Sequence, residues 1–544
     1  MSWQAEVDEL NHRKALAAQM GGEERVKRQR DAGKLNIRQR IEAIVDHRAD
    51  PAGGPARTTF SEIGATSGVG TYDEAGKLVS FMPANLVIGI ADIDGRPVML
   101  SGDDFTVRGG SAEATIPAKR DMAERLALEL RLPHVRLVDG MGGGGSVKSI
   151  EIKGRTLIPQ IAGWEHVVGH LAVAPSVALA LGSVAGIGAA RVATSHYSVI
   201  VSETAQMMIA GPALVEQAGQ PEVSKEDLGH ARVHTTNGAI DDAVPTEAEA
   251  FARTKRFLSY LPRNIDELPP RGEPTDDPDR RDESLLSVVP RNPRRVYKMR
   301  DIIASVFDRE PERDPDATDD GAISGSSFFE IGRDWGRSVI CGLARLDGWP
   351  VAVIAEDPYV YGGAWTADAS AKVIRHLDMA STFHLPVVHL EDCPGFLIGK
   401  QSEDQATIRI GSRALAALGQ CTSPFCCIVI RKAFGVAGAS NRKPGSLHPR
   451  WSWPSGDWGS LPIEGGIEVA YRTELAGLEG EAFDAELAAI KERLNQYRSP
   501  FRASEVFEID DVIDPRDSRP TLCRWANLVA PARTTGPSSF TYRP

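Results

Sequence analysis

The sequence IADIDGRPVML at Ile90–Leu100 decides the fold, because it recurs as LARLDGWPVAV at Leu343–Val353. Two further pairs of segments keep the same spacing of 253 residues without a gap: DDFTVRGG (103–110) with EDPYVYGG (356–363), and LPHVRLVDGMG (132–142) with LPVVHLEDCPG (385–395). Glycine, proline and aspartate positions that match in this way indicate a duplicated domain. Two similar domains predict a cleft or an interface between them where two related ligands sit.

The repeat continues at a slightly different spacing. PSVALALGSVAGIG at Pro175–Gly188 parallels PFCCIVIRKAFGVA at Pro424–Ala437, with a spacing of 249 residues. About four residues are therefore lost between the two blocks of the second copy. In both copies short β-branched runs alternate with helix-like segments such as Ala118–Arg131, which predicts an α/β fold.

Length and composition limit the class of protein. A chain of 544 residues is too long for one core, so two domains are expected. The net charge of −12 argues against nucleic acid as a partner, since phosphate binding needs a basic surface. The six cysteines lack metal-ligand spacing, and we interpret them as reduced, buried thiols. The N-terminus lacks a signal-peptide pattern and no long apolar run occurs, which predicts a cytoplasmic protein that is not embedded in a membrane.

Changes in composition predict the domain boundaries. Residues 1–265 form the expected N-terminal domain, which begins with charged helices over residues 5–47. Residues 266–325 are rich in proline, aspartate and arginine and are expected to be linker and surface loop. Residues 326–544 form the expected C-terminal domain, with helical periodicity over 475–500 and an irregular tail from Pro515.

Each copy ends in turns in which a strand, a glycine and a helix follow one another. The turns are Asp139–Gly142 and Ala185–Gly188 in the first copy, and Asp392–Phe396 and Phe434–Ala437 in the second. Small residues at a helix start leave backbone N–H groups unshielded, and the helix dipole lies behind them. Such amides suit an oxygen that gains negative charge, so two related pockets predict two enolate-type intermediates. The structural alternative is that these glycines serve only tight turns and close packing.

The sequence offers no clear acid–base apparatus. Its histidines are scattered, and neither a G-x-S-x-G nor an H-E-x-x-H motif occurs. The run Gly142–Gly145 lacks the spacing of a phosphate-binding loop. Two amide pockets without a general base favour chemistry in which the substrates supply the base. No metal site is expected.

At this point the motifs resemble a known family. The chain is similar to the carboxyltransferase (β) subunits of biotin-dependent acyl-CoA carboxylases, of the propionyl-CoA and methylcrotonyl-CoA types. The motifs that carry the resemblance extend over most of the chain: Gly33–Ile41, Phe60–Gly64, Asp104–Ser111, Val223–Thr236, Pro394–Phe396 and Arg431–Gly435.

The resemblance implies two tandem crotonase-like (ClpP/crotonase) β-β-α superhelical domains. It also implies a homohexamer of two stacked trimers, in which the N-domain of one subunit meets the C-domain of another at the active site. The N-half would bind acyl-CoA, and the C-half would bind biotin carried on a separate biotin carboxylase or carrier (α) subunit. Carboxybiotin would release CO2, the biotin enolate would take the α-proton of the thioester, and the thioester enolate would attack CO2.

The resemblance assigns roles to residues of this sequence. The catalytic amide pockets would be formed by Gly186, Ile187 and Gly188 in the N-half, and by Gly435, Val436 and Ala437 in the C-half. The substrate-binding residues would be Gly109, Gly110, Met141, Gly142, Gly143, Pro394, Gly395, Phe396, Gly438 and Ala439.

The sequence departs from the family pattern at several of these positions. Isoleucine and valine stand where glycine is usual in the amide pairs, at Ile187 and Val436. Asp139-Gly-Met-Gly-Gly-Gly144 replaces Asp-Ser-Gly-Gly-Ala-Arg, so that an arginine is lost and Met141 takes a glycine position. Ala439 stands where propionyl-CoA enzymes often have an acid, whereas His448-Pro-Arg-Trp451 favours the methylcrotonyl-type pattern. The acyl group is therefore open, and Met141 and Ala439 are expected to influence its choice.

Two alternatives remain beside a carboxylase subunit. The same fold serves as the carboxyltransferase part of a biotin-dependent decarboxylase or transcarboxylase, which differs in direction or partner. A third hypothesis, of another class, is a non-catalytic scaffold subunit of a carboxylase complex, which the altered segment at Met141 favours. The chain shows no biotinyl A-M-K-M segment, so the activity would require a partner that carries biotin.

Overall fold

The computed structural model describes residues 2–50, 54–111, 114–140, 150–151, 154–156, 158, 161, 163–311, 325–443 and 448–538. The chain folds into two compact units, the N-terminal unit up to Glu267 and the C-terminal unit from Leu268. Among the residues that the structure describes, no helix is long and apolar enough to cross a membrane.

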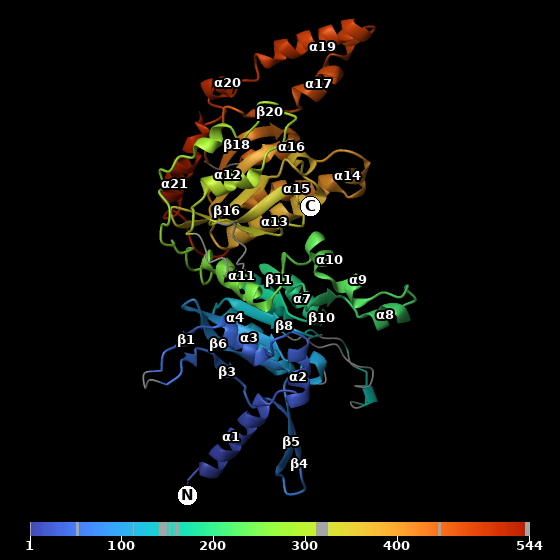
Figure 1. Ribbon diagram of the computed structural model, residues 1–544, viewed down its shortest axis with the longest axis vertical. Helices are drawn as coiled ribbons and strands as arrows, with labels where there is room; N and C mark the ends of the chain where they lie inside the picture. Colours follow the sequence, from blue (N-terminus) through green and yellow to red (C-terminus); the bar gives the residue numbers. More distant parts are fainter. Residues whose placement is uncertain are drawn as a thin grey trace. The chain divides into compact units, whose positions relative to one another are not determined.

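A twisted sheet of seven strands forms the centre of the N-terminal unit (Figure 1). Three strands at one edge pair antiparallel, and the remaining strands follow in parallel register. The order across the sheet is β13 (Asp242–Val244), β11 (Tyr197–Val201), β9 (Ser176–Ala180), β8 (His134–Val138), β7 (Arg96–Asp103), β6 (Leu86–Ile93) and β3 (Ser61–Ile63).

The C-terminal unit repeats this arrangement in a sheet of eight strands. The order is β14 (Phe329–Ile331), β15 (Val339–Leu346), β16 (Trp349–Glu356), β17 (Val387–Cys393), β18 (Phe425–Phe434), β19 (Arg450–Ser452) and β21 (Asp511–Val512), with β20 (Asp457–Gly459) also paired to β18. In the N-terminal unit, β10 (Ser183–Ala185) pairs with β12 (Gln206–Met208) as the end of β18 pairs with β20.

Strand register confirms the duplication residue by residue. The pair Ile88 and Ser101 in β6–β7 corresponds, 253 positions later, to Cys341 and Ile354 in β15–β16. The repeat also reaches upstream, beyond what the sequence comparison found: Phe60-Ser-Glu-Ile-Gly64 has the place of Phe328-Phe-Glu-Ile-Gly332. The predicted α/β class with two β-β-α domains is confirmed.

Helices cover the sheets and complete both units. Those of the N-terminal unit are α1 (Gln4–Ala18), α2 (Glu23–Asp31), α3 (Ile37–Ile44), α4 (Pro117–Glu129), α6 (Trp164–Leu171), α7 (Ile187–Ala193), α8 (Pro212–Gln217), α9 (Lys225–Gly229), α10 (Ala231–Thr236) and α11 (Glu247–Ser259). Those of the C-terminal unit are α12 (Met299–Val306), α13 (Ala367–Thr382), α14 (Lys400–Asp404), α15 (Thr407–Gln420), α16 (Gly435–Gly438), α17 (Ile463–Ala470), α18 (Arg472–Leu475), α19 (Gly480–Asn495), α20 (Pro500–Glu505) and α21 (Ser518–Val529).

Local sequence explains the helix that leads into each core. Ile37, Ile41 and Ile44 of α3 recur at helical spacing and are buried. The Asn36 side chain accepts from the Gln39 N–H and the Gln39 side chain accepts from the Asn36 N–H, which forms a capping box. Helix α12 has the equivalent place in the C-terminal unit, with Met299, Ile303 and Val306 buried.

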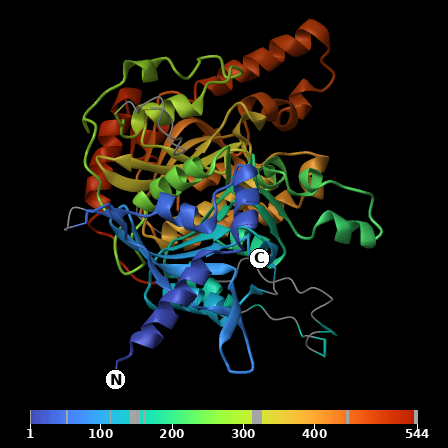
Figure 2. The same ribbon diagram turned by 60° about the horizontal axis from the view of Figure 1, so that its bottom comes forward.

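Two elements extend away from the sheets. Helix α1 and the hairpin of β4 (Gly68–Tyr72) and β5 (Leu78–Pro83) project together from the N-terminal unit (Figure 1). Helices α17 and α19 project from the C-terminal unit in both views (Figure 2). Together with α18 they have a small apolar core, formed by Ile467, Leu475 and Ile490.

The structure differs from the sequence prediction in two segments. Within 266–325, which the composition predicts to be linker, α12 and neighbouring side chains such as Leu285 and Tyr297 belong to the C-terminal core. Beyond Pro515, where the sequence predicts an irregular tail, α21 buries Leu522 and Trp525 in the same core. In both cases a few apolar residues at helical spacing form a helix that packs on the core, despite the proline and charged residues around them. The average composition of the segment does not reveal such a short pattern.

The cysteines agree with their interpretation as buried thiols. All six are free and buried, and Cys426 and Cys427 lie in β18 as the apolar run predicts. Burial raises the pKa of both thiols well above the ordinary value, so they stay protonated and unreactive at neutral pH.

A duplicated aspartate fixes the turn of the hairpin that opens each domain. The Asp46 carboxylate accepts from the N–H groups of Asp94 (2.9 Å) and Gly95 (2.7 Å). The Asp308 carboxylate accepts from Asp347 (2.9 Å) and Gly348 (2.8 Å) in the same manner. The two hairpin turns are thus equivalent atom for atom.

A buried lysine predicts an unusual dependence of stability on pH. Lys119 is 8% exposed and donates to the Gly64 carbonyl at 2.9 Å. Burial lowers its pKa to about 8, so the unfolded chain binds a proton that the folded chain lacks between roughly pH 8 and 10.5. Stability therefore rises with pH across this window. Between pH 8 and pH 10, we expect the free energy of unfolding of the wild-type protein to rise by about 2 kcal/mol more than that of Lys119→Met, as measured by urea denaturation. Equal gains in both proteins would contradict this assignment.

Candidate active site

The first predicted amide pocket lies where β10 meets α7. Gly186 connects them with φ 57° and ψ −123°, a backbone conformation that side chains disfavour. Its own N–H faces the Met208 and Ile209 carbonyls at 3.2 Å, which ties the turn to the end of β12. The N–H groups of Ile187 and Gly188 follow in the first turn of α7. Gly186 is exposed and Gly188 buried, so the turn borders solvent.

The second predicted amide pocket repeats this geometry at the end of β18. Gly435 has φ 61° and lies 249 positions after Gly186, and the Ser460 carbonyl lies beside it at the end of β20. The Val436 side chain is 55% exposed, while Ala437 is fully buried. Sequence reasoning therefore located both turns, and the structure gives them the same neighbours.

The four backbone amides can act as anion donors. In the described part of the chain, the N–H groups of Ile187, Gly188, Val436 and Ala437 have no hydrogen-bond acceptor outside their own helix. Amides in the first turn of a helix have no intrahelical partner either, and the positive end of the helix dipole lies at the same place. Each turn can therefore bind an oxygen on which negative charge develops.

Other predicted substrate-binding residues form a close contact between glycine segments in the N-terminal unit. Gly109 and Gly110 form a left-handed turn that packs on Gly140: a Cβ at Gly110 would lie 3.0 Å from the Gly140 Cα. In the second copy, Gly363 packs in the same way on the Asp392 carbonyl. Met141, Gly142 and Gly143 follow Gly140 directly and lie outside the described residues.

The segment Pro394–Phe396 reaches the second turn. A Cβ at Gly395 would lie 3.5 Å from the carbonyl of Phe434, the residue before the Gly435 turn. The Gly395 carbonyl accepts from the Trp365 N–H at 3.0 Å, and the Trp365 and Phe396 rings meet edge to face. Three segments that are distant in sequence thus converge at this turn.

A cavity of about 480 Å3 opens beside the second turn. Three residues that line it have predicted roles: Gly435 as catalytic, and Gly438 and Ala439 as substrate-binding. Further lining residues come from later strands and loops: Val429, Ala433, Asn441, Arg442, Arg450, Trp458, Gly459, Phe507, Glu508 and Ile509. Arg450 donates to the Asn441 side chain at 2.8 Å. Sequence reasoning assigned no binding role to Arg442 or Arg450, although Arg450 belongs to the quoted motif His448-Pro-Arg-Trp451.

Buried aspartates anchor the strands that precede the glycine segments. Asp139 follows β8 and pairs with Arg40 (2.9 Å) and Lys34 (3.2 Å). Asp392 ends β17 and pairs with Arg431 at 3.0 Å. Tyr297 also donates to Asp392 at 2.8 Å, and burial beside this carboxylate raises the pKa of the tyrosine so that it remains a donor. The two copies thus fix equivalent aspartates with cations from different elements.

A second buried contact ties α16 to the sheet of the C-terminal unit. His389 of β17 places Nε2 2.9 Å from Glu356 and Nδ1 3.3 Å from the Ser440 carbonyl, just beyond α16. Beside it, burial and the nearby Glu356 carboxylate raise the pKa of Glu391 well above the ordinary value. No sequence signal singles out these buried groups, because their roles depend on contacts across strands.

The histidines of the N-terminal core do not act as a base. His134 and His170 are fully buried, and burial lowers the pKa of both, in His170 to about 3. His170 also has its ring Nε2 2.8 Å from the Leu132 carbonyl. These rings are neutral structural groups, as their scattered positions in the sequence suggest.

Comparison with known proteins places this geometry in a family. Residues 28–540 match the carboxyl transferase domain. The carboxyltransferase subunit of propionyl-CoA carboxylase from Haloferax mediterranei is 28% identical over 99% of this chain and 98% of its own length. The α subunit of methylmalonyl-CoA decarboxylase from Veillonella parvula is 28% identical over 97% of each chain.

Solved structures agree with the sequence comparison. Transcarboxylase 12S, determined as a hexamer with methylmalonyl-coenzyme A bound, has a TM-score of 0.83 and 27% identity over 100% of this chain and 99% of its own. A single-chain long-chain acyl-CoA carboxylase shares the fold, with a TM-score of 0.75 over 96% of this chain. The structure has two crotonase-like domains with paired glycine turns, and the family model matches most of the sequence. The chain is therefore an enzyme of the carboxyl transferase domain family.

Proposed function

We propose that this enzyme transfers CO2 from carboxybiotin to the α-carbon of an acyl-CoA thioester. The observation that carries the proposal is the pair of equivalent glycine turns, at Gly186 and Gly435, each followed by free first-turn amides. Because the reaction places negative charge first on one carbonyl oxygen and then on another, two related amide pockets match its needs.

In the N-terminal unit, the amides of Ile187 and Gly188 would hold the thioester oxygen. Two donors at a helix start stabilise the enolate form more than the neutral thioester, which lowers the barrier to removal of the α-proton. Gly186 has no side chain, and a Cβ at this position would still lie 4.0 Å from the nearest neighbouring atom, so a substrate can approach the turn closely.

In the C-terminal unit, the residues present fit a biotin ring. The amides of Val436 and Ala437 offer two donors to its carbonyl oxygen, and the cavity of about 480 Å3 lies directly beside them. Carboxylated biotin, when bound, supplies both the CO2 and the base. The side chains at the turn, Val436 and Ala437, are aliphatic and take up no proton, which agrees with a base that comes from outside the protein.

The partner follows from this chemistry. We propose that a separate biotin carboxylase or biotin-carrier (α) subunit delivers the biotin, and that the chain assembles as a homohexamer in the cytoplasm. The relative with the solved hexamer supports the assembly, and the names of the carboxylase relatives support a dedicated carboxyltransferase subunit.

A biotin-dependent decarboxylase or transcarboxylase component is the second candidate. Its support is specific: the relatives include a methylmalonyl-CoA decarboxylase subunit and transcarboxylase 12S at the same level of identity. The chemistry at the two turns is the same in both directions. Purification of the native complex distinguishes them, since a biotin carboxylase partner would establish carboxylation and a membrane-bound decarboxylase partner the reverse reaction.

The half-reaction with free biotin tests the proposal. The purified chain is incubated with biotin and a panel of malonyl-type CoA thioesters, and loss of the thioester carboxyl group is followed. We expect decarboxylation of at least one thioester at a rate that depends on biotin. If a protein that still binds CoA decarboxylates none of the thioesters, the result would contradict the proposal and favour a scaffold.

The cavity that we assign to biotin also predicts where acyl preference is determined, because the acyl α-carbon must approach carboxylated biotin there to receive CO2. Ala439 is exposed and lines this cavity next to Gly438. A carboxylate at this position would change contacts with an alkyl chain by about 1–2 kcal/mol. We expect Ala439→Asp to change the ratio of kcat/KM between two acyl-CoA substrates by about tenfold. A uniform fall for every substrate would contradict a role in selection. Ala439→Ser is the matched small, neutral control.

A further inference from the structure

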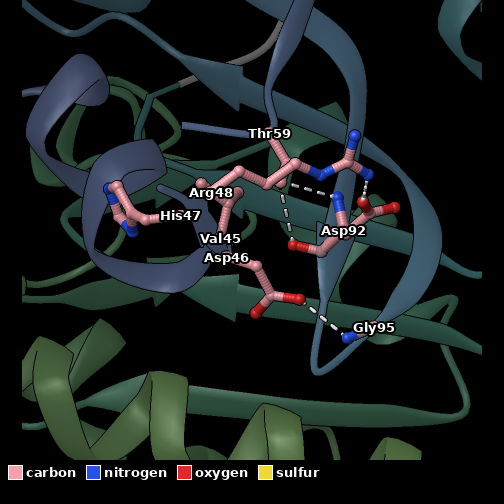
Figure 3. Close-up of a pocket in the computed structure, with 7 residues that line it drawn as sticks. All are labelled: Val45, Asp46, His47, Arg48, Thr59, Asp92 and Gly95. Carbon is pink, nitrogen blue, oxygen red and sulfur yellow. Dashed lines mark hydrogen bonds and ion pairs between the residues drawn. The ribbon is translucent and has the colours of Figure 1, made fainter. Parts of the chain in front are cut away.

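A pocket of about 620 Å3 lies at the hairpin turn of the N-terminal unit (Figure 3). We call it the hairpin groove, and none of its lining residues belongs to the turns at Gly186 and Gly435. Figure 3 shows the Asp46 carboxylate bound to the Gly95 N–H, and Arg48 paired with Asp92. The groove is lined by Val45, Asp46, His47, Arg48, Thr59, Asp92 and Gly95.

The duplication gives every part of this groove a counterpart in the C-terminal unit. The Asp46 cap of the Gly95 turn corresponds to the Asp308 cap of the Gly348 turn. The Asp92 N–H donates to the Thr59 hydroxyl as the Arg345 N–H donates to Ser327. The backbone that surrounds the groove is therefore the same in both copies.

In the C-terminal unit an extended segment covers this counterpart. The Gly272 N–H donates to the Gly348 carbonyl at 2.9 Å. Arg271, the residue before it, donates to the Asp347 backbone carbonyl (2.8 Å) and side chain (2.6 Å). Thr275 donates to the Arg309 carbonyl at 2.6 Å.

The same segment continues along the end of α12. Asp276 accepts from the Arg309 N–H at 2.9 Å, and Arg280 donates to the Ser305 and Phe307 carbonyls. Arg519 of α21 supplies a cation 2.8 Å from Asp308. The Gly348 carbonyl, the Asp347 side chain and the Asp308 carboxylate are thereby satisfied by the protein itself.

The hairpin groove has the acceptors of its counterpart without the donors. Among the described residues, none donates a hydrogen bond to the carbonyl of Gly95 or Val45. Asp46 has backbone donors but no cationic partner in the described part of the chain. Asp94, the counterpart of Asp347, is 59% exposed, and Lys255 at 3.6 Å is its one cationic partner within the described ranges. The groove thus offers the Asp46 carboxylate and the carbonyls of Val45 and Gly95, with the Asp94 carboxylate at the adjacent position of the turn.

We propose that the hairpin groove docks an extended, arginine-bearing segment of a partner protein. The segment would give a backbone N–H to the Gly95 carbonyl and a guanidinium to Asp94, as Gly272 and Arg271 do in the duplicate, and a second cation to Asp46. Backbone pairing along an open edge provides affinity, and the charged pairs provide specificity. This inference is independent of the proposed carboxyl transfer, and its test uses no activity measurement.

The internal duplicate supplies the probe. A fluorescent peptide with the sequence of Pro269–Asp282 is titrated into the full-length protein and its anisotropy is measured. We expect saturable binding that Asp94→Asn weakens about tenfold, the value of one charge-assisted hydrogen bond. Asparagine suits the positive φ of 49° at this position, so the turn is preserved. The peptide with Arg271→Ala should lose the same factor.

A double-mutant cycle assigns the contact. If Arg271 of the peptide meets Asp94, combining both changes weakens binding no further than either change alone. Glu216→Gln, an exposed acid on α8, is the matched control and should leave binding unchanged. The proposal is overturned by the absence of saturable binding at millimolar peptide, by additive losses, or by an equal effect of the control. Dissociation of the oligomer by the peptide would also overturn it, since the groove would then hold a second copy of this chain.

Discussion

Ala437→Pro should lower the rate of carboxyl transfer by about 10²- to 10³-fold, because it deletes one of the two donors at the second glycine turn. Ala437 lies in the first turn of a helix, where proline leaves the remaining hydrogen bonds intact. Its side chain is fully buried, so the change acts on the backbone donor and on local packing. The measurement is kcat for the half-reaction with free biotin, beside a thermal unfolding curve.

The matched control is Ala437→Gly, which keeps the N–H group and removes only a methyl group. We expect this variant to retain a rate within a few-fold of wild type, since the donor persists. If Ala437→Pro folds normally and turns over at the wild-type rate, the second turn is not an oxyanion pocket. Equal losses in the proline and glycine variants would assign the effect to packing instead.

Arg40→Met should lower the free energy of unfolding by about 3–5 kcal/mol, because it leaves the buried Glu247 carboxylate without its cation and leaves the buried Asp139 carboxylate with Lys34 only among the described residues. The Arg40 guanidinium is fully buried and donates to Asp139 (2.9 Å) and Glu247 (2.8 Å). Methionine preserves most of the side-chain volume, so the change removes charge more than packing. Urea denaturation followed by circular dichroism gives the free energy.

Arg28→Met is the control for loss of an arginine at the surface. Arg28 pairs with Glu24 at 3.2 Å, but both side chains are exposed, at 78% and 88%. Screening by water leaves such a pair worth less than about 1 kcal/mol. An Arg40→Met variant as stable as Arg28→Met would show that the buried network does not hold the N-terminal unit together.

Most of the fold could be predicted from the sequence, because the chain contains two copies of one domain. Residue patterns that occur at matching positions in both copies supported the same prediction twice. Aligned glycines and prolines predicted that two segments of the chain are equivalent, and the strand registers of β6–β7 and β15–β16 agree with that alignment. The parts that could not be predicted are those where a few apolar residues lie within a segment of mostly polar composition. Helix α12 lies within an acidic, proline-rich segment, yet its apolar face enters the core.

The candidate site was predictable as far as it depends on the backbone. Glycine turns such as Gly186 and Gly435 leave a local pattern that sequence shows directly. Side chains that approach from other strands leave no such pattern, and Arg450 of the cavity and His389 behind α16 are examples. Their roles follow from pairing of β17, β18 and β19, which only the folded chain reveals.

One measurement tests the central claim most directly: transfer of a labelled carboxyl group between the two substrates. A malonyl-type CoA thioester carrying 13C in its free carboxyl group is mixed with free biotin and the purified enzyme, and carboxybiotin is detected by mass spectrometry. We expect labelled carboxybiotin with the wild-type chain and a strong loss of label with Ala437→Pro. A wild-type enzyme that decarboxylates the thioester but passes no label to biotin, with or without an intact second turn, would contradict carboxyl transfer through the paired turns.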